Sequence, residues 1–473
     1  METPKPESRK GRWIVIGAIV ILVTPIFLIV VVNTFDEELS PEAKALLVAP
    51  PNPYRPEENL YLALAGFEGP SGASLVALGE DRVAAHEKDI AAALQDPQHR
   101  FADLTEQEDR LKFRGEIYFC APLIESCVDE VERHEAEIAR LLRDNRELVQ
   151  RYLRLRDFKG YHDTATPGPH FPSPYVPVPV REVYLSSIAL QAKAGGPLQQ
   201  KAVLADLHDD IQTWRRMLTG SGSLISKMVA VANLHGDHVL LADLIAERKF
   251  DAEGLSAQIR AALELLTEDD WKIGSASGYE FRAVAFVWDQ QRVAMGRRTG
   301  QTPGKEGQWW ERLLEFRSPF FQINAIQNLQ ARETVQRKLV ADAPPKEFLA
   351  ARDVYRKWLD DNVQFGVHYV YNPFGKFILA MEAGNNLDYS LRAYDGAALV
   401  RLVRLGYEIR SQKIEDREIR SFMQRHPEWA SHPVSGKPFV WDGRTREIAL
   451  QNLGNQPKDR RFSITAWSAA LRK

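Results

Sequence analysis

Two clusters of histidines and carboxylates are the residues whose types and spacing best suit chemistry. HGDH contains His235 and His238, and DLHDD spans residues 206–210. Imidazoles and carboxylates bind metals, and ligands on two different helices can converge on one ion. The alternative is structural: DLHDD is the solvated side of a helix whose buried side holds Leu204 and Leu207, and the histidines are surface residues near a loop. We favour this alternative and expect neither a metal nor a cofactor.

No recognised motif for hydrolysis or nucleotide binding occurs in the sequence. His134-Glu135 opens HEAEI, which lacks the second histidine of a zinc-protease helix. There is no G-x-S-x-G elbow and no phosphate-binding glycine loop, and GSGS at 220–223 is typical of a helix break with a serine cap. We therefore predict no catalytic residue. A glycosidase remains an alternative, because its two carboxylates need not be neighbours in sequence.

The two cysteines, Cys120 and Cys127, are most simply a disulfide if the chain is exported. On a continuous helix, residues at this spacing are about 10 Å apart, beyond the roughly 7 Å limit between bridged alpha carbons. The disulfide therefore requires a turn, which Pro122 allows. The alternatives are an unbonded pair in a core and a redox pair, although the thioredoxin-type spacing is C-x-x-C.

An unbroken apolar run of 20 residues, 13–32, is the strongest localisation signal. At about 1.5 Å per residue it spans about 30 Å, the hydrocarbon thickness of a bilayer, so we expect the bilayer to be a partner of this segment. Four cations precede the run, within residues 1–12, and acids follow it at 36–38. This asymmetry predicts a cytoplasmic N-terminus and an exported, periplasmic body.

A cleavable signal peptide is the rival interpretation of this run. The run exceeds the usual apolar region of about 7 to 15 residues, and no small-x-small cleavage site follows it. We therefore predict an uncleaved, single-pass signal anchor over residues 13–33. Pro25 is tolerable within a membrane helix.

Composition favours a folded, mainly α-helical body rather than a nucleic-acid binder. The net charge is −3, so no basic excess attracts nucleic acid. Apolar residues recur at helical spacing in most segments, and residues 128–158 predict one long amphipathic helix. A glycine-rich polar loop is expected at 296–308. Further helices are expected at 57–66, 75–94, 183–194, 198–218, 223–246, 255–266, 309–316, 323–340 and 345–362.

Proline-rich stretches suggest the domain organisation. The expected parts are a cytoplasmic tail (1–12), the transmembrane anchor (13–33), a proline-rich linker (34–56), an N-terminal helical region (57–163), a proline-rich crossover (164–180), a main helical region (181–431) and a small β-containing module (432–473). The helical regions are expected to consist of antiparallel helical hairpins.

Two short motifs have structural interpretations. NPFGK at 372–376 is typical of a helix start, with Asn372 as the N-cap and proline in the first turn. HPVSGKPFVWD at 432–442 leads from turn residues into an aromatic strand, and Asp442-Gly443 indicates a hairpin turn.

These stretches together resemble an uncharacterised family of bacterial membrane-anchored envelope proteins. The resembling segments are ENLYLALAGFEGPSG, the paired cysteines, LADLHDDIQTWRRMLTGSGSLISKMVA, NPFGK and HPVSGKPFVWD. His432 stands where the related pattern usually has aspartate. The resemblance implies placement in a Gram-negative inner membrane and brings no established activity.

The leading functional hypothesis is a non-enzymatic envelope scaffold or interaction protein, with an unidentified envelope protein as its partner. The alternatives are an envelope hydrolase acting on peptidoglycan or another glycan, and an accessory factor of a secretion system or pilus. A deep cleft with two carboxylates about 5 to 10 Å apart would favour the hydrolase.

Overall fold

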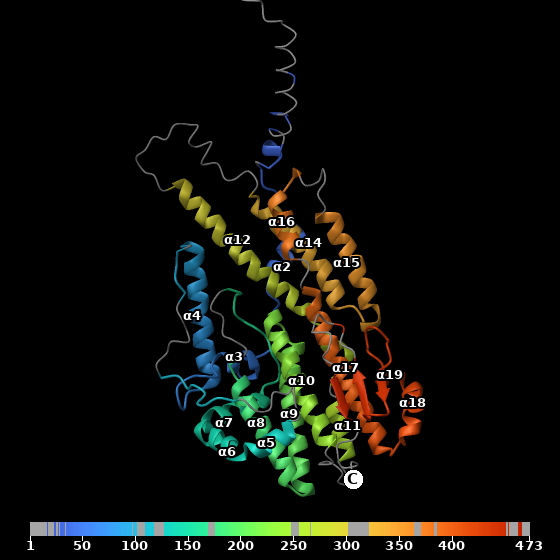
Figure 1. The fold of residues 1–473 in the computed structure, drawn as a ribbon. Coiled ribbons are helices and arrows are strands. Elements are labelled where there is room, and N and C mark those ends of the chain that lie inside the picture. The colour runs from blue at the N-terminus through green and yellow to red at the C-terminus, as the bar shows by residue number, and fades with distance from the viewer. Residues whose placement is uncertain are drawn as a thin grey trace, which may run out of the picture.

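The computed structural model shows a mainly helical protein with a small antiparallel sheet near its C-terminal end (Figure 1). The structure describes residues 17, 23, 24, 27, 29–33, 35–96, 98–101, 109–117, 127–168, 176–246, 255–264, 266–300, 321–363, 370–382, 386–450, 453 and 462–465. Every structural statement below concerns these residues.

The chain alternates long helices with short 3-10 turns. The α-helices are α2 (Pro41–Leu47), α3 (Leu60–Ala65), α4 (Leu75–Gln95), α5 (Cys127–Arg133), α6 (Glu135–Asp144), α7 (Arg146–Arg154), α8 (Val178–Ala194), α9 (Pro197–Thr219), α10 (Leu224–Ala246), α11 (Ser256–Glu264), α12 (Ser277–Gly300), α14 (Ile323–Ala341), α15 (Phe348–Val363), α16 (Pro373–Glu382), α17 (Asn386–Ser411), α18 (Asp416–Arg425) and α19 (Pro427–Ala430). The 3-10 turns are η1 (Pro56–Glu58), η2 (Leu155–Asp157), η3 (Glu268–Trp271), η4 (Gly274–Ala276) and η5 (Pro345–Glu347), and the strands are β1 (Val440–Asp442), β2 (Glu447–Leu450) and β3 (Phe462–Thr465).

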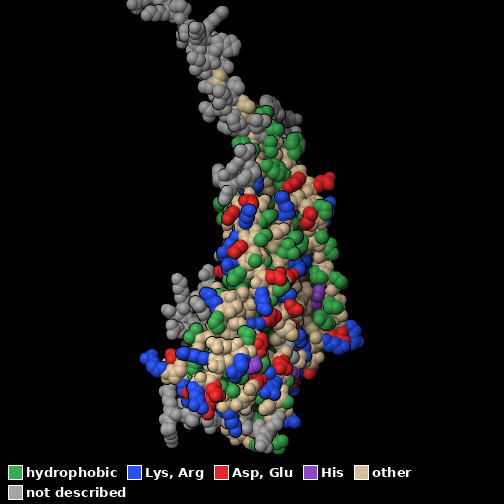
Figure 2. Space-filling model, turned by 90° about the vertical axis from the view of Figure 1, so that its right-hand side faces the viewer, with side chains coloured by type: hydrophobic (Ala, Val, Ile, Leu, Met, Phe, Trp, Pro, Cys, Tyr) green, Lys and Arg blue, Asp and Glu red, His purple; other side chains and the backbone are tan. Residues whose placement is uncertain are grey.

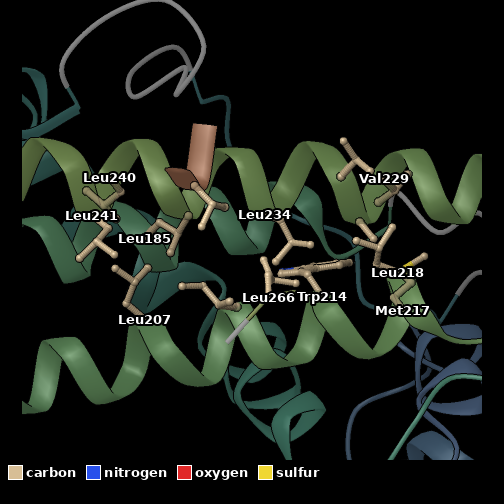
Figure 3. Packing of buried hydrophobic residues seen from close by; sticks show 14 of the residues in the cluster. Leu185, Leu207, Trp214, Met217, Leu218, Val229, Leu234, Leu240, Leu241 and Leu266 are labelled. Atoms are coloured by element: carbon tan, nitrogen blue, oxygen red, sulfur yellow. The ribbon is translucent and has the colours of Figure 1, made fainter. Parts of the chain in front are cut away.

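The α9–α10 hairpin lies at the centre of the main core. Proline starts α9, Gly220 ends it, and α10 returns beside it. Leu207 and Trp214 of α9 face Leu234 and Leu241 of α10, with Leu185 of α8 between the helices (Figure 3). Because these side chains are nearly fully buried, each contributes on the order of 2 kcal/mol of hydrophobic stabilisation.

Helix α10 is apolar around most of its circumference because it is enclosed by other helices. Among the described residues it is the one helix long and apolar enough to cross a membrane, and 72% of its most apolar window is buried inside the body. An all-round apolar helix in a protein interior passes the same length and hydropathy test as a membrane span. The predicted anchor at 13–33 lies mostly outside the described residues; those that are described between 23 and 32 are helical.

A second group of helices lies at the end of the body where the N-terminal segment joins it. Helices α12, α14, α15 and α16 pack together there, with α2 among them (Figure 1). Trp288, Ile326 and Ile378 form one small core in this group, and Leu329 and Leu379 form another. The protein is therefore elongated, with the main core in one part and separate small cores at this end (Figure 1).

The two helical regions expected from the sequence share one core rather than folding apart. Within the first region, Asn59 holds the 160–163 segment beside the start of α3: its Nδ2 donates to the His162 carbonyl (2.8 Å), and its Oδ1 accepts from the His162 N–H (3.0 Å). The main core extends from Leu60 in α3 to Val434 beyond α19. The segment at 160–163 also pairs with Ser221 between α9 and α10.

The prediction of one continuous helix over 128–158 is wrong. The chain forms α5, α6 and α7 instead, with breaks at His134 and Asn145. Asn145 Nδ2 donates to the carbonyls of Leu141 and Arg114 (2.9 Å each), and its Oδ1 accepts from the Arg114 N–H (2.7 Å). A side chain that bonds backbone groups in this way competes with helix continuation.

Two other expectations change. The glycine-rich loop expected at 296–308 does not begin at 296, because α12 continues to Gly300. Residues 301–320, including the expected 309–316 helix, lie outside the described residues. The proline-rich crossover ends earlier than expected: α8 begins at Val178, with Pro179 in its first turn, where proline needs no N–H partner.

The C-terminal β-module is confirmed over its described part. Its strand order is β1-β2-β3, all antiparallel, and Asp442 pairs with Glu447 across the expected turn. Asp442 Oδ1 accepts from the Arg444 N–H (2.9 Å), which closes that turn. Trp441 and Ile448 face a separate core built on α17 and α18.

The predicted disulfide is not tested. Cys127 begins α5, and Cys120 lies outside the described residues, as does Pro122. The bond between Cys120 and Cys127 therefore stays a prediction.

Gly79→Ala tests the close approach of α3 and α4. A Cβ atom at Gly79 would lie 2.0 Å from the Leu62 carbonyl oxygen, so the two helices would have to separate. We expect a loss of about 1 to 3 kcal/mol in the free energy of unfolding. Gly278→Ala in α12 is the matched control, since its nearest outside atom is 3.5 Å away. Equal losses in denaturant unfolding of both variants would contradict the close packing.

Candidate functional site at the exit of the apolar segment

Asn33, directly after the apolar run, fastens the run to the helical body. Its Nδ2 donates to the carbonyls of Ile29 (2.8 Å) and Val370 (2.6 Å), and its Oδ1 accepts from the Asn372 N–H (2.9 Å). Asn33 is only 2% exposed. One side chain thus closes the last turn of the preceding helix and joins it to the start of α16.

The next residues continue this attachment along α14. Asp36 accepts from two N–H groups at the start of α14, those of Asn324 (2.8 Å) and Ala325 (3.0 Å). A carboxylate there is also stabilised by the helix dipole. Asn328 holds the segment further on: its Nδ2 donates to the Glu38 carbonyl (2.8 Å) and its Oδ1 accepts from the Ser40 N–H (2.7 Å).

Helix α2 completes the junction. Ser40 caps it by accepting from the Ala43 N–H (3.1 Å), and Pro41 occupies its first turn. Ala43 is fully buried against Phe281 of α12 and Ala331 of α14. Residues 35–47, expected to be part of a linker, therefore pack on the body instead of separating it from the apolar run.

The NPFGK motif at 372–376 supplies a partner of Asn33 in this junction. Asn372 caps α16 as predicted, with its Oδ1 accepting from the Gly375 N–H (3.0 Å), and its backbone is left-handed (φ 48°). A Cβ at Gly375 would lie 2.4 Å from Asn372 Oδ1, so a larger residue there would displace the capping side chain. The left-handed turn aims the Asn372 N–H at Asn33.

A pocket of about 210 Å³ lies beside the junction. It is lined by Glu37, Leu329, Arg332, Asp361, Asn362, Tyr371, Asn372 and Lys376. Burial, with Glu37 and Asp36 nearby, raises the pKa of Tyr371 to about 12, and burial together with Arg332 lowers the pKa of Lys376. The pocket is partly open and is lined by charges of both signs. It therefore suits the binding of a charged polar group.

The histidine and aspartate clusters singled out in the sequence do not form this site. HGDH lies in the middle of α10, so the interpretation of its histidines as loop-proximal surface residues is wrong. Asp237 and His238 are fully buried, and Asp210 is nearly so. The DLHDD segment is therefore not wholly a solvated side.

Arg181 of α8 explains why these acids are buried. Its Nε donates to Asp210 Oδ2 (3.0 Å), and its Nη2 donates to Asp237 Oδ1 and to the Asn233 carbonyl (2.6 Å). Tyr152 of α7 donates to the other oxygen of Asp210. Burial lowers the pKa of Arg181, but Asp237 and Asp210 raise it by more, so the guanidinium stays charged.

The remaining acids of DLHDD lie outside this network. Asp206 and Asp209 each face Arg156 Nη1 at 3.4 Å, and the cavity beside them is only about 10 Å³. That is the space of about one water molecule. Among the described residues, no group of three or more His, Cys, Asp or Glu side chains is placed to hold a metal ion.

A larger cleft of about 560 Å³ lies between α4 and the end of α7. Glu57, Glu80 and Asp157 line it, and all three are exposed. The general acid of a glycosidase keeps its proton because its surroundings are apolar. These exposed acids therefore do not favour the hydrolase alternative.

The HPVSGK motif forms a structural bond that sequence reasoning missed. His432 is 2% exposed, its Nε2 lies 3.1 Å from Asp395 Oδ1, and its Nδ1 accepts from the Val434 N–H (3.1 Å). It holds the start of the β-module against α17.

Asn33 was also missed, because an asparagine at the end of an apolar run carries no signal of its distant partners.

Comparisons of this chain with models of protein families, with curated proteins and with solved structures find no match.

Arg181→Met tests the buried ion network. Without the guanidinium, two carboxylates lie close together in the core without a cation, and removing one partner of a buried ion pair typically costs about 3 to 5 kcal/mol. We expect a loss of that size in denaturant unfolding. Arg156→Met is the control, because Arg156 pairs with Asp206 and Asp209 at the surface and should change stability by less than about 1 kcal/mol. A similar small loss in both variants would contradict the role of Arg181.

His238 predicts a pH dependence of stability. Burial lowers its pKa from 6.5 to about 4, so the folded protein holds it neutral while the unfolded chain protonates. The unfolded state then binds more protons between pH 6.5 and 4, and stability falls as the pH falls through that window, by up to about 3 kcal/mol. His238→Gln should flatten this part of the profile of unfolding free energy against pH. An unchanged slope in the variant would show that other groups cause it.

Proposed function

We propose that this chain is a single-pass membrane-anchored envelope protein whose helical body acts as a scaffold held at a fixed position on the membrane. One observation supports it most: Asn33 and Asp36 attach the end of the apolar run directly to α16 and α14. A tether to a freely moving domain needs no such bonds, because a flexible linker would serve.

The free energy needed to break the junction favours a fixed orientation of the body relative to the apolar run. Breaking the junction would leave the buried Asn372 N–H and the Val370 carbonyl without their partner, at a cost of about 1 to 3 kcal/mol for each group. The burial of Ala43 and the bonds of Asn328 add to this. The body then presents the same surfaces at the same height above the bilayer, which is what a scaffold for a partner in the envelope requires.

Anchoring and topology are tested first. The full chain should remain in membranes after alkaline carbonate extraction, and a phosphatase fused after Lys473 should be active in the periplasm. Release of the full-length chain by carbonate, or an inactive fusion, would overturn the anchored topology.

The fixed attachment is tested with the double variant Asn33→Ala/Asp36→Ala. We expect it to stay in the membrane, while amide exchange across 35–47 accelerates by roughly tenfold or more, as loss of about 1.4 kcal/mol implies. Asn52→Ala/Asp81→Ala removes the same residue types at exposed positions and serves as control. Exchange that is unchanged in the first variant would contradict a fixed junction.

The scaffold role is tested with the same pair of variants. Crosslinking in membranes, followed by purification of the chain, should recover the same partner from the wild type and the control, and less of it from Asn33→Ala/Asp36→Ala. If no partner is recovered reproducibly from the wild type, the scaffold proposal fails, whatever the anchoring experiments show.

A further inference from the structure

Large apolar side chains are exposed at the end of the body where the apolar run joins it. Phe35, two residues after Asn33, is 76% exposed, and on α16 Phe377 and Met381 are 52% and 59% exposed. Hydrophobic side chains gather at this end of the molecule (Figure 2). Phe377 and Met381 are four residues apart and therefore lie on one side of their helix.

The opposite side of α16 packs against the helical body. Ile378 and Leu379 are buried against α12, α14 and α15. Helix α16 is thus apolar on two sides, of which only one is packed within the described structure. An all-round apolar helix normally has an apolar neighbour on each side.

The position of α16 identifies that neighbour. Its cap, Asn372, is bonded to Asn33 at the end of the apolar run. Phe377 lies five residues further along, about 7 Å at 1.5 Å per residue. The headgroup layer on each side of a bilayer is of similar depth, roughly 5 to 8 Å. A body fastened at Asn33 therefore brings Phe377 to the level of the lipid headgroups.

The charges at this end fit the same surface. Arg332 is exposed on α14, and Lys376 precedes Phe377 on α16; both line the pocket beside the junction, together with the acids Glu37 and Asp361. Cations attract the phosphates of lipid headgroups, and the apolar face of an interfacial helix, including phenylalanine, inserts at the boundary between headgroups and hydrocarbon.

We propose that α16 is a second membrane contact, with Phe377 lying among lipid headgroups. This inference rests on the proposed anchoring of the apolar run. It adds a surface of the folded body that touches lipid in its own right, so the body rests on the bilayer instead of standing clear of it.

The test places a photoreactive benzoylphenylalanine at single positions of the full chain. The positions are Phe35, Phe377, Met381 and Val440; Val440 on β1 is 64% exposed and is the matched control. Each variant is reconstituted in bilayers of phosphatidylethanolamine with a minority of phosphatidylglycerol, illuminated, and examined by mass spectrometry for lipid adducts. Circular dichroism of each variant checks that the fold is retained.

We expect lipid adducts at Phe35 and Phe377, fewer at Met381 and at least tenfold fewer at Val440. Adducts at Phe35 without adducts at Phe377 would overturn the second contact and leave the anchor intact. A lack of adducts at Phe35 would instead overturn the anchoring on which the inference rests. Adducts of Phe377 with a second copy of the chain or another protein would show that α16 is a protein interface, which also overturns the proposal.

Discussion

The burial of Arg181 between Asp210 and Asp237 is the constraint around which the main core is organised. It joins α8, α9 and α10, and Tyr152 brings α7 into the same network. The indole nitrogen of Trp214 donates to the Tyr152 hydroxyl (3.2 Å), and the Arg181 guanidinium lies 5.9 Å from the Trp214 ring centroid. Because each buried charge needs its partner, arrangements of the four helices that separate Arg181 from Asp210 or Asp237 are strongly disfavoured. Hydrophobic packing alone would tolerate several arrangements of these helices.

That core bears on the proposed scaffold role, because closely packed interiors resist deformation. The helices that meet the N-terminal segment are connected to the main core because α12 and α17 contact α10, and α14 contacts α12 and α17. A displacement at the junction is therefore resisted by the packed body as well as by the bonds of Asn33 and Asp36. A protein built in this way holds its surfaces at a set distance from its point of attachment, which is the property that the proposed scaffold uses.

The contrast between the two polar clusters shows how burial decides the role of a residue. Asp206 and Asp209 remain at the surface with Arg156, whereas Asp210, on the same helix, turns inward to Arg181. Sequence spacing identified the helix and its apolar side, but it could not distinguish these aspartates. The distinction depends on Arg181, which lies 29 positions away on α8. Likewise, the side chain of Asn145 ended a helix that the apolar pattern predicted to continue, because it found partners at Arg114.

The sequence by itself determined the local elements: most helices, their proline starts and glycine ends, the Asn372 cap and the small sheet. It also determined the apolar run at 13–32. These features depend on residues close together along the chain, where periodicity and capping act. Only the tertiary structure decided that residues 35–47 pack on the body, that Asp237 and His238 lie in the core, and that Asn33 meets Asn372. The physical reason is that the free energy of a buried polar group depends on its partner, and the partners of Asn33 and Asp237 come from distant parts of the chain.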